Sequence, residues 1–228
     1  YKRVVIVEMP GPSVEKDIEK LGVKLKIIDH HDYTDIKRAH DKRGRYLDSS
    51  LEQFLRYFRI SDKKLKELGF KPELVKGIGL WDRGFYWELR EQKYSKKQVR
   101  EVVAYRDELM APYRDQRKEE GKIATAKRVW KKRKEWNGFM IVEDDTDLSI
   151  RGRVSMIIAR EYDKPIAMIL VEKKRGFIYV QETDFAEALF EHFGGFTFGS
   201  GRNWGFANDG KKKVGLEDVK GFLEKLIK

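Results

Sequence analysis

Two adjacent histidines follow an aspartate in this chain, at Asp29, His30 and His31. Alternating apolar residues over 23–28 predict a short buried strand, so the three side chains should lie at its carboxyl end. In open α/β sheets, ligands bind at the carboxyl ends of the strands. A carboxylate beside imidazoles suits a divalent cation such as manganese. The tripeptide is therefore a candidate metal site.

A second acidic side chain should lie beside this tripeptide. Residues 2–8 predict a strand that ends at Glu8, and residues 14–21 predict a helix with Ser13 as its N-cap. This helix joins the first strand to the strand that ends at Asp29. Such a βαβ unit places the carboxyl ends of its two parallel strands at the same edge of a sheet. Glu8 should therefore face the same space as the histidines.

Composition limits the kind of site. Of the 228 residues, 40% are hydrophobic, which is enough for a sizeable core in one large or two small domains. The chain has no cysteine, so disulfides, thiolate metal sites and thiol nucleophiles are excluded. Any metal must then be held by histidine and carboxylate, which favours Mn²⁺ or Mg²⁺.

Composition also bears on location and partner. No apolar run approaches the roughly 20 residues that cross a bilayer, and no signal peptide is recognised, so we expect a cytoplasmic protein without a membrane partner. Charged residues make up 38% of the chain, with abundant Lys and Glu, which is typical of thermophile proteins. The net charge of +11 and the pI of about 9.5 favour an anionic partner, most simply nucleic acid.

The first half of the chain continues with helices after the tripeptide. Residues 33–48 predict a polar, basic loop. Ser50, followed three residues later by Gln53, is a capping signature for the next helix. A later helix, 72–81, ends in a glycine-punctuated turn around Asp82.

The second half predicts a separate domain. Its pattern changes from charged and helical to alternating strands and helices, with a glycine and aromatic loop at 194–210. We therefore expect an α/β protein with a parallel-sheet domain at 1–110, a helical connector at 111–136, and a smaller α/β domain at 137–228.

Taken together, these features resemble the DHH phosphoesterase superfamily, which includes RecJ-like exonucleases, oligoribonucleases and family II inorganic pyrophosphatases. In that family the DHH tripeptide ends a strand, as Asp29-His30-His31 does in the predicted pattern. A serine-capped helix follows, matched by "SSLEQFL", and then an aspartate in a turn, matched by Asp82 in "WDRG". The resemblance covers nearly the whole chain.

The resemblance implies roles for these residues. His30 and Asp82 would be ligands of one metal, and Glu8 would be a bridging ligand in the place where the family has aspartate. His31 would face a phosphate, and Asp29 would support the histidines from behind. The expected catalytic group is thus Asp29, His30, His31 and Asp82. From the residues alone, Glu8 could equally be an exposed strand-end glutamate, and Asp82 could be only a turn residue.

The C-terminal half resembles the substrate-binding domain of the same family, whose hallmark is a glycine-rich G-G-G-H loop. The match is "FGSGRNWGF", in which Arg202 replaces the usual histidine. Glycines let a backbone approach a phosphate closely, and arginine can bind one in a bidentate manner. The next residues would add a polar contact and a stacking face for a base. The expected substrate-binding residues are Gly199, Ser200, Gly201, Arg202, Asn203 and Trp204.

A basic segment with interleaved tryptophans allows two interpretations. Residues 127–136 contain Trp130 and Trp136 among Lys and Arg. Such a segment could follow a nucleic-acid backbone while its indoles stack on bases. Equally, it could be a solvated connector helix with both tryptophans packed on a domain.

The function implied by the resemblance is binding and hydrolysis of phosphodiester bonds in single-stranded or short nucleic acids, with manganese. Family members carry a further motif on a preceding strand, a histidine with an Asp-x-Asp pair, which the given residues lack. We therefore expect ligands for one metal only. This favours the alternative of a catalytically impaired member that acts as a nucleic-acid-binding protein or as a partner of replication or repair proteins. Self-association into a homo-oligomer is a further expected partner state.

Overall fold

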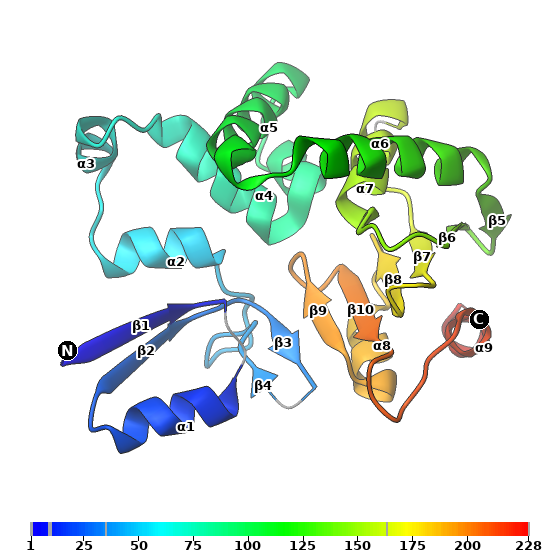
Figure 1. Cartoon of the computed structure of the whole chain (residues 1–228), viewed down its shortest axis with the longest axis horizontal. Coiled ribbons are helices and arrows are strands. Elements are labelled where there is room, and N and C mark those ends of the chain that lie inside the picture. The colour runs from blue at the N-terminus through cyan, green and yellow to red at the C-terminus, as the bar shows by residue number, and fades with distance from the viewer. Residues whose placement is uncertain (1, 9–10, 35, 163, 228) are drawn as a thin grey trace. The chain divides into compact units, whose positions relative to one another are not determined.

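The chain has a mixed α/β structure, shown in Figure 1 as a computed structural model that describes residues 2–8, 11–34, 36–162 and 164–227. It divides into two compact units, with the boundary between Val103 and Ala104. Residues 111–136, the expected connector, therefore fall within the second unit. No helix in the described ranges is both long and apolar enough to cross a bilayer.

The first unit begins with the expected βαβ arrangement, which is confirmed. Its strands pair in parallel from Arg3 opposite Lys24 to Val7 opposite Ile28. The helix between them begins after Gly11, with Pro at its first position. Ser13, the predicted N-cap, therefore lies inside the helix. Proline fits there because the first helical residue needs no backbone N–H partner. The elements are β1 (Arg3–Val7), α1 (Pro12–Lys20) and β2 (Lys24–Ile28).

Helices make up most of the remainder of this unit. The N-cap of the first is Ser49, whose hydroxyl accepts from the Glu52 N–H while the Glu52 carboxylate accepts from the Ser49 N–H. The predicted cap, Ser50, was therefore one residue too late, because glutamate at this spacing completes the capping box. The elements are the short strands β3 (Asp32–Tyr33) and β4 (Ile36–Lys37), and the helices α2 (Ser50–Tyr57), α3 (Asp62–Glu67), α4 (Pro72–Glu91) and α5 (Lys96–Met110), the last of which contains the boundary.

Two glycines of α4 allow close packing of its neighbours. A Cβ added at Gly77 would lie 2.4 Å from a methyl of Val102 on α5, and one at Gly79 would lie 3.0 Å from the Glu52 side chain on α2. A side chain at Gly77 would force α5 to shift, and one at Gly79 would require the Glu52 side chain to move by a few tenths of an ångström. This packing brings the start of α2 to the α4 segment that carries Asp82.

Helix α4 continues past Asp82, where the sequence predicted a turn. It is interrupted two residues later, at Gly84 and Phe85, where the backbone is not helical. Phe85 has φ 56° and ψ −145°, a conformation that is costly for a residue with a side chain. Asp82 therefore lies in the last helical turn before this break.

The second unit is built on a mixed sheet with the strand order β9-β10-β8-β7-β6-β5. Within this order β6 and β7 are parallel, and the other neighbours are antiparallel. Helix α6 packs against α7 and β6 (Figure 1). The elements are the 3-10 helix η1 (Ala111–Tyr113), α6 (Gln116–Lys131), β5 (Lys134–Trp136), β6 (Phe139–Asp144), α7 (Arg151–Glu161), β7 (Met168–Glu172), β8 (Phe177–Gln181), α8 (Ala186–Phe193), β9 (Phe196–Phe198), β10 (Asn203–Ala207) and α9 (Leu216–Leu226).

The predicted loop at 194–210 is largely a hairpin, which corrects the sequence prediction. Strand β9 pairs with β10 antiparallel, with Phe198 opposite Asn203. Strand β10 continues the sheet, and its second residue, Trp204, is fully buried in the main apolar core. Apolar residues two apart on these strands explain the result, because alternate residues of a strand point to the same face.

Candidate metal site

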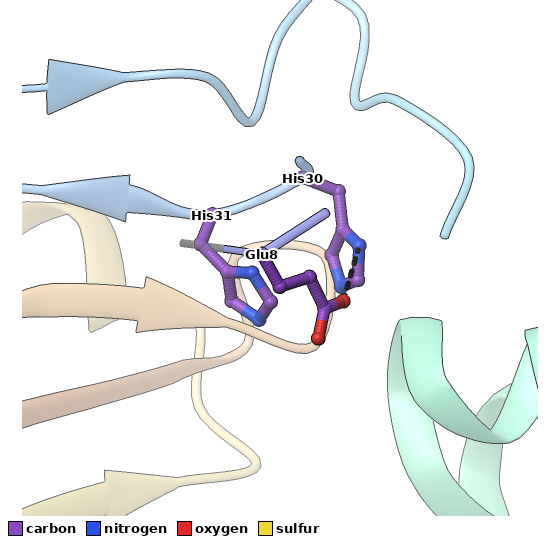
Figure 2. A group of neighbouring side chains, drawn as sticks. All are labelled: Glu8, His30 and His31. Carbon is purple, nitrogen blue, oxygen red and sulfur yellow. Dashed lines mark ion pairs between the residues drawn. The ribbon is translucent and has the colours of Figure 1, made fainter. Parts of the chain in front are cut away.

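Three side chains that could bind a cation meet at the ends of β1 and β2. Glu8, His30 and His31 each offer one ligand atom, and these atoms all lie within 4.8 Å of one another (Figure 2). Glu8 follows β1, and its N–H donates to the Ile28 carbonyl over 3.0 Å. Its φ of 53° is left-handed, which is uncommon for a residue with a side chain and is often found at functional sites.

His31 is oriented by the buried carboxylate of Asp29. Oδ1 of Asp29 lies 3.0 Å from His31 Nδ1, and it also accepts from the backbone N–H groups of His30 and His31. An ionised carboxylate only accepts hydrogen bonds, so Nδ1 of His31 carries a proton. In the neutral ring, the lone pair is then on Nε2. Metal-binding histidines are commonly held in this way by a carboxylate behind them.

His30 is held by Ser50, at the start of α2. The Ser50 N–H donates to His30 Nδ1 over 2.9 Å, and the Ser50 hydroxyl lies 3.1 Å from the same nitrogen. Nε2 of His30 is buried and has no hydrogen-bond partner among the described residues. The bond from the Ser50 N–H makes Nδ1 the acceptor, so the proton of the neutral ring is on Nε2. Binding of a cation at Nε2 would require the other tautomer, in which Nδ1 donates its proton to the Ser50 hydroxyl and the bond from the Ser50 N–H is lost.

The two rings are stacked, with centroids 4.1 Å apart, yet their pKa values move in opposite directions. Burial, with the charge of His31, lowers the pKa of His30 to about 4. Burial also acts to lower the pKa of His31, but its hydrogen bond and charge interaction with Asp29, and the charges of Glu8 and Asp82, raise it overall. Burial acts to raise the pKa of Asp29, but the hydrogen bonds from His31 and His30 and the charge of His31 lower it overall. His30 is therefore neutral near pH 7.

Asp82 lies near this group and is not part of it. Its Oδ2 is 3.9 Å from His30 Nδ1, comparable to the 3.7 Å between Glu8 Oε1 and the same nitrogen, and its side chain is 37% exposed. The next residue, Arg83, donates to Asp48 and Glu88. The structure thus adds His31 to Glu8 and His30, and it leaves Asp82, which the resemblance implies as a ligand together with His30, beside them. Asp82 contributes negative charge at the edge of the site.

Two further side chains at the site were not singled out from the sequence. Ser50 was interpreted only as a helix cap, although its main contact is His30, twenty residues away in the sequence. Tyr33 lies beside His31, with ring centroids 6.1 Å apart. Burial, together with the charges of Asp29 and Glu8, raises the pKa of Tyr33 to about 12, so its phenol stays protonated. No short-range pattern in the sequence indicates either contact.

The glycine-rich segment of the second unit is the tight turn between β9 and β10. Gly199, Ser200 and Gly201 all have positive φ, at 62°, 51° and 73°. The Arg202 N–H donates to the Gly199 carbonyl over 3.2 Å. Left-handed backbone at three successive residues explains why glycine occupies two of them. Arg202 is half-buried at the end of this turn.

The next two residues are structural, which corrects the prediction that they contact substrate. The Asn203 side chain accepts from the Glu182 N–H and donates to the Phe198 carbonyl. Trp204 is 0% exposed, and its indole N–H donates to the Gly194 carbonyl over 2.8 Å. A buried indole offers no face to a base, so the predicted stacking role is wrong.

The tryptophans of the basic segment also pack on the protein. Trp130 is 2% exposed, and its indole N–H donates to Glu161 over 2.7 Å. The Arg133 guanidinium lies over the Trp130 ring, and Lys220 lies over Trp136. Of the two interpretations of residues 127–136, the structure therefore favours packed tryptophans.

Three comparisons were made with known proteins: with family models, with curated sequences and with solved structures. No family model matches the chain, and neither does any curated protein or solved structure.

Proposed function

We propose that the group formed by Glu8, His30 and His31 binds a divalent cation, Mn²⁺ in the first instance, as the reactive centre of a phosphoesterase of the DHH type. The observation that supports this is the convergence of one carboxylate and two imidazoles within 4.8 Å, at the carboxyl ends of two parallel strands. Strand ends of this kind are the usual ligand-binding edge of α/β sheets.

The residues present fit such a cation. A mixed set of carboxylate and imidazole ligands suits Mn²⁺ or Zn²⁺, whereas Mg²⁺ is typically bound by oxygen ligands alone. The buried Nε2 of His30, without a hydrogen-bond partner among the described residues, would gain one in the cation. The carboxylate-backed His31 supplies a lone pair on Nε2, and neutral His30 would supply one once its proton moves to Nδ1, beside the Ser50 hydroxyl.

Each residue then has a role in phosphoester hydrolysis. A bound cation would supply Lewis-acid polarisation of a phosphoryl oxygen. Glu8, His30 and His31 would fix the position of the phosphoryl group relative to β1 and β2. Asp29 would hold the His31 ring in place. Tyr33, kept protonated, would offer a hydrogen-bond donor beside the site.

Nucleic acid is the proposed substrate class because of the charge of the chain. The net charge is +11, and exposed lysines surround the end of α6 and β5, at Lys127, Lys131, Lys132 and Lys134. Exposed lysines can contact the phosphates of single-stranded nucleic acid, and such contacts do not depend on the base sequence. The same lysines support the second candidate function, nucleic-acid binding without cleavage, which needs no cation.

Mn²⁺ binding is tested by electron paramagnetic resonance of Mn²⁺ mixed with the whole chain. Bound Mn²⁺ no longer contributes to the signal of the free ion, so the loss of that signal measures binding. Glu8→Gln removes one ligand oxygen charge and should weaken binding about 10-fold or more. Asp17→Asn, which removes an exposed carboxylate paired with Lys20 on α1, is the matched control and should bind as the wild type does. Equal affinity in all three proteins would overturn the proposed site.

Hydrolysis is tested with the same proteins on labelled single-stranded DNA and short RNA. Mn²⁺-dependent cleavage by the wild type and by Asp17→Asn, but not by Glu8→Gln, supports the phosphoesterase. Binding without cleavage that weakens steeply with salt supports the second candidate instead. Absence of both cleavage and binding would contradict the nucleic-acid assignment.

A further inference from the structure

The carboxylate that orients His31 has a second oxygen that faces an arginine. Asp29 Oδ1 makes all of its hydrogen bonds to the two histidines, whereas Oδ2 is buried and has no hydrogen-bond partner in the described part of the chain. Nη1 of Arg38 lies 3.7 Å from Oδ2. This nitrogen is likewise buried without a hydrogen bond. The two groups thus face each other at ion-pair distance, on the side of Asp29 away from His31.

Arg38 is itself held on two sides. Its Nη2 donates to Glu15 on α1 over 2.5 Å. The carboxylate of Asp32, which is 6% exposed, accepts from the backbone N–H groups of Arg38 and Ala39 over 2.6 and 2.8 Å. The guanidinium is therefore held by Glu15 of α1, while the backbone that carries Arg38 is held by Asp32 of the strand that follows the histidines. Only 16% of the Arg38 side chain is exposed.

We propose that Arg38 is a positioning residue for the cation site: it holds Asp29 in the orientation that keeps the His31 proton on Nδ1 and the lone pair on Nε2. The cation part of this inference rests on the proposed function, whereas the effect on the His31 ring does not. Arg38 acts through Asp29, because no contact between Arg38 and the three ligand residues is present among the described interactions.

The physical reason lies in the freedom of a carboxylate. A buried carboxylate is costly unless cations and hydrogen bonds face it, and a guanidinium on one side fixes which oxygen turns to the other. Without Arg38, nothing faces Asp29 Oδ2 at ion-pair distance among the described interactions, and the carboxylate can rotate. His31 would then lose the acceptor for its Nδ1 proton, and the proton would redistribute between the two ring nitrogens. Nε2 of His31 would then be free to bind a cation in a smaller fraction of the molecules.

The first test compares Mn²⁺ affinity in three variants of the whole chain. Arg38→Met keeps the length of the side chain and removes its charge, and should weaken binding about 10- to 100-fold, as is typical when a partner behind a ligand is lost. Arg38→Lys keeps a cation near Asp29 and should restore part of the loss. Arg45→Met is the matched control, because Arg45 lies in the same loop and pairs with Asp41, away from the site. Loss in Arg38→Met equal to that in Arg45→Met would overturn the proposal.

The second test needs no metal. Nitrogen-15 NMR of the imidazoles in the metal-free protein, at a pH where His31 is neutral, distinguishes a proton on Nδ1 from one on Nε2. The wild type should show His31 protonated on Nδ1, Arg38→Met a mixture, and Arg38→Lys an intermediate state. An unchanged His31 tautomer in folded Arg38→Met would refute the positioning role. If Arg38→Met does not fold, an Arg38→Lys spectrum and affinity identical to wild type would refute the need for the guanidinium geometry.

The two tests separate this inference from the proposed function. A wild type that binds no Mn²⁺ but shows the Arg38-dependent tautomer would contradict the cation site and leave the arrangement of Arg38, Asp29 and His31 supported. If the wild type binds Mn²⁺, and neither the affinity nor the His31 tautomer depends on Arg38, the cation site is supported and the positioning role of Arg38 is contradicted.

Discussion

Acidification should destabilise the first unit through His30, and the size of the effect follows from its burial. The His30 side chain is 3% exposed, and its pKa falls from 6.5 to about 4 on folding. Each factor of ten in proton affinity is worth about 1.4 kcal/mol, so the difference amounts to about 3 kcal/mol. A histidine with a lowered folded pKa binds protons more weakly in the folded state. The free energy of unfolding is therefore unaffected by His30 above pH 6.5, falls as the pH drops from 6.5 to 4, and levels off below 4.

The assay is urea unfolding of the wild type and of His30→Gln at several pH values between 7 and 4. The wild type should lose about 3 kcal/mol more than the variant over this range, because glutamine does not titrate. The comparison cancels other groups that titrate in the same window. The intrinsic stability of His30→Gln does not matter, because only the slope with pH is compared. Parallel curves for the two proteins would refute a neutral, buried His30.

Three other predictions concern side chains around the site and in the helices. Ser50→Ala removes the hydroxyl that can accept from a protonated Nδ1 and should lower Mn²⁺ affinity about 10-fold, measured by calorimetry, and an unchanged affinity would contradict ligation through Nε2. Ultraviolet titration should show a tyrosine with a pKa of about 12 that disappears in Tyr33→Phe, and its persistence in that variant would assign the value elsewhere. Gly77→Ala should destabilise the protein by about 1–2 kcal/mol in urea, since its Cβ would lie 2.4 Å from Val102, whereas Gly152→Ala, with nothing within 4 Å, should be neutral or stabilising.

The sequence was most informative where a pattern in neighbouring residues determines how secondary-structure elements pair. The parallel pairing of β1 and β2, and with it the approach of Glu8 to the histidines, follows from a short connection through one helix, which restricts the topology. The alternation of strands and helices from β6 to α8 also followed from hydrophobic periodicity, whereas β9 and β10 were predicted as a loop. These features depend on residues that are near one another in the chain.

Contacts between distant residues were not predictable from the same patterns. Ser50 reaches His30 because α2 packs beside β2, and nothing in the residues near Ser50 indicates this. Arg38 was one of several basic residues in a predicted loop, and only the fold shows which of them faces Asp29. Trp204 was misassigned because the flanking glycines suggested a loop, whereas burial of alternate apolar residues produced a strand.

The central claim, a cation held by Glu8, His30 and His31, is tested most directly by anomalous diffraction from crystals of the whole chain soaked in Mn²⁺. We expect an anomalous peak about 2.0–2.3 Å from one carboxylate oxygen of Glu8 and from one ring nitrogen of each histidine. A peak held by other residues, or no peak at a Mn²⁺ concentration that saturates binding in solution, would contradict the claim.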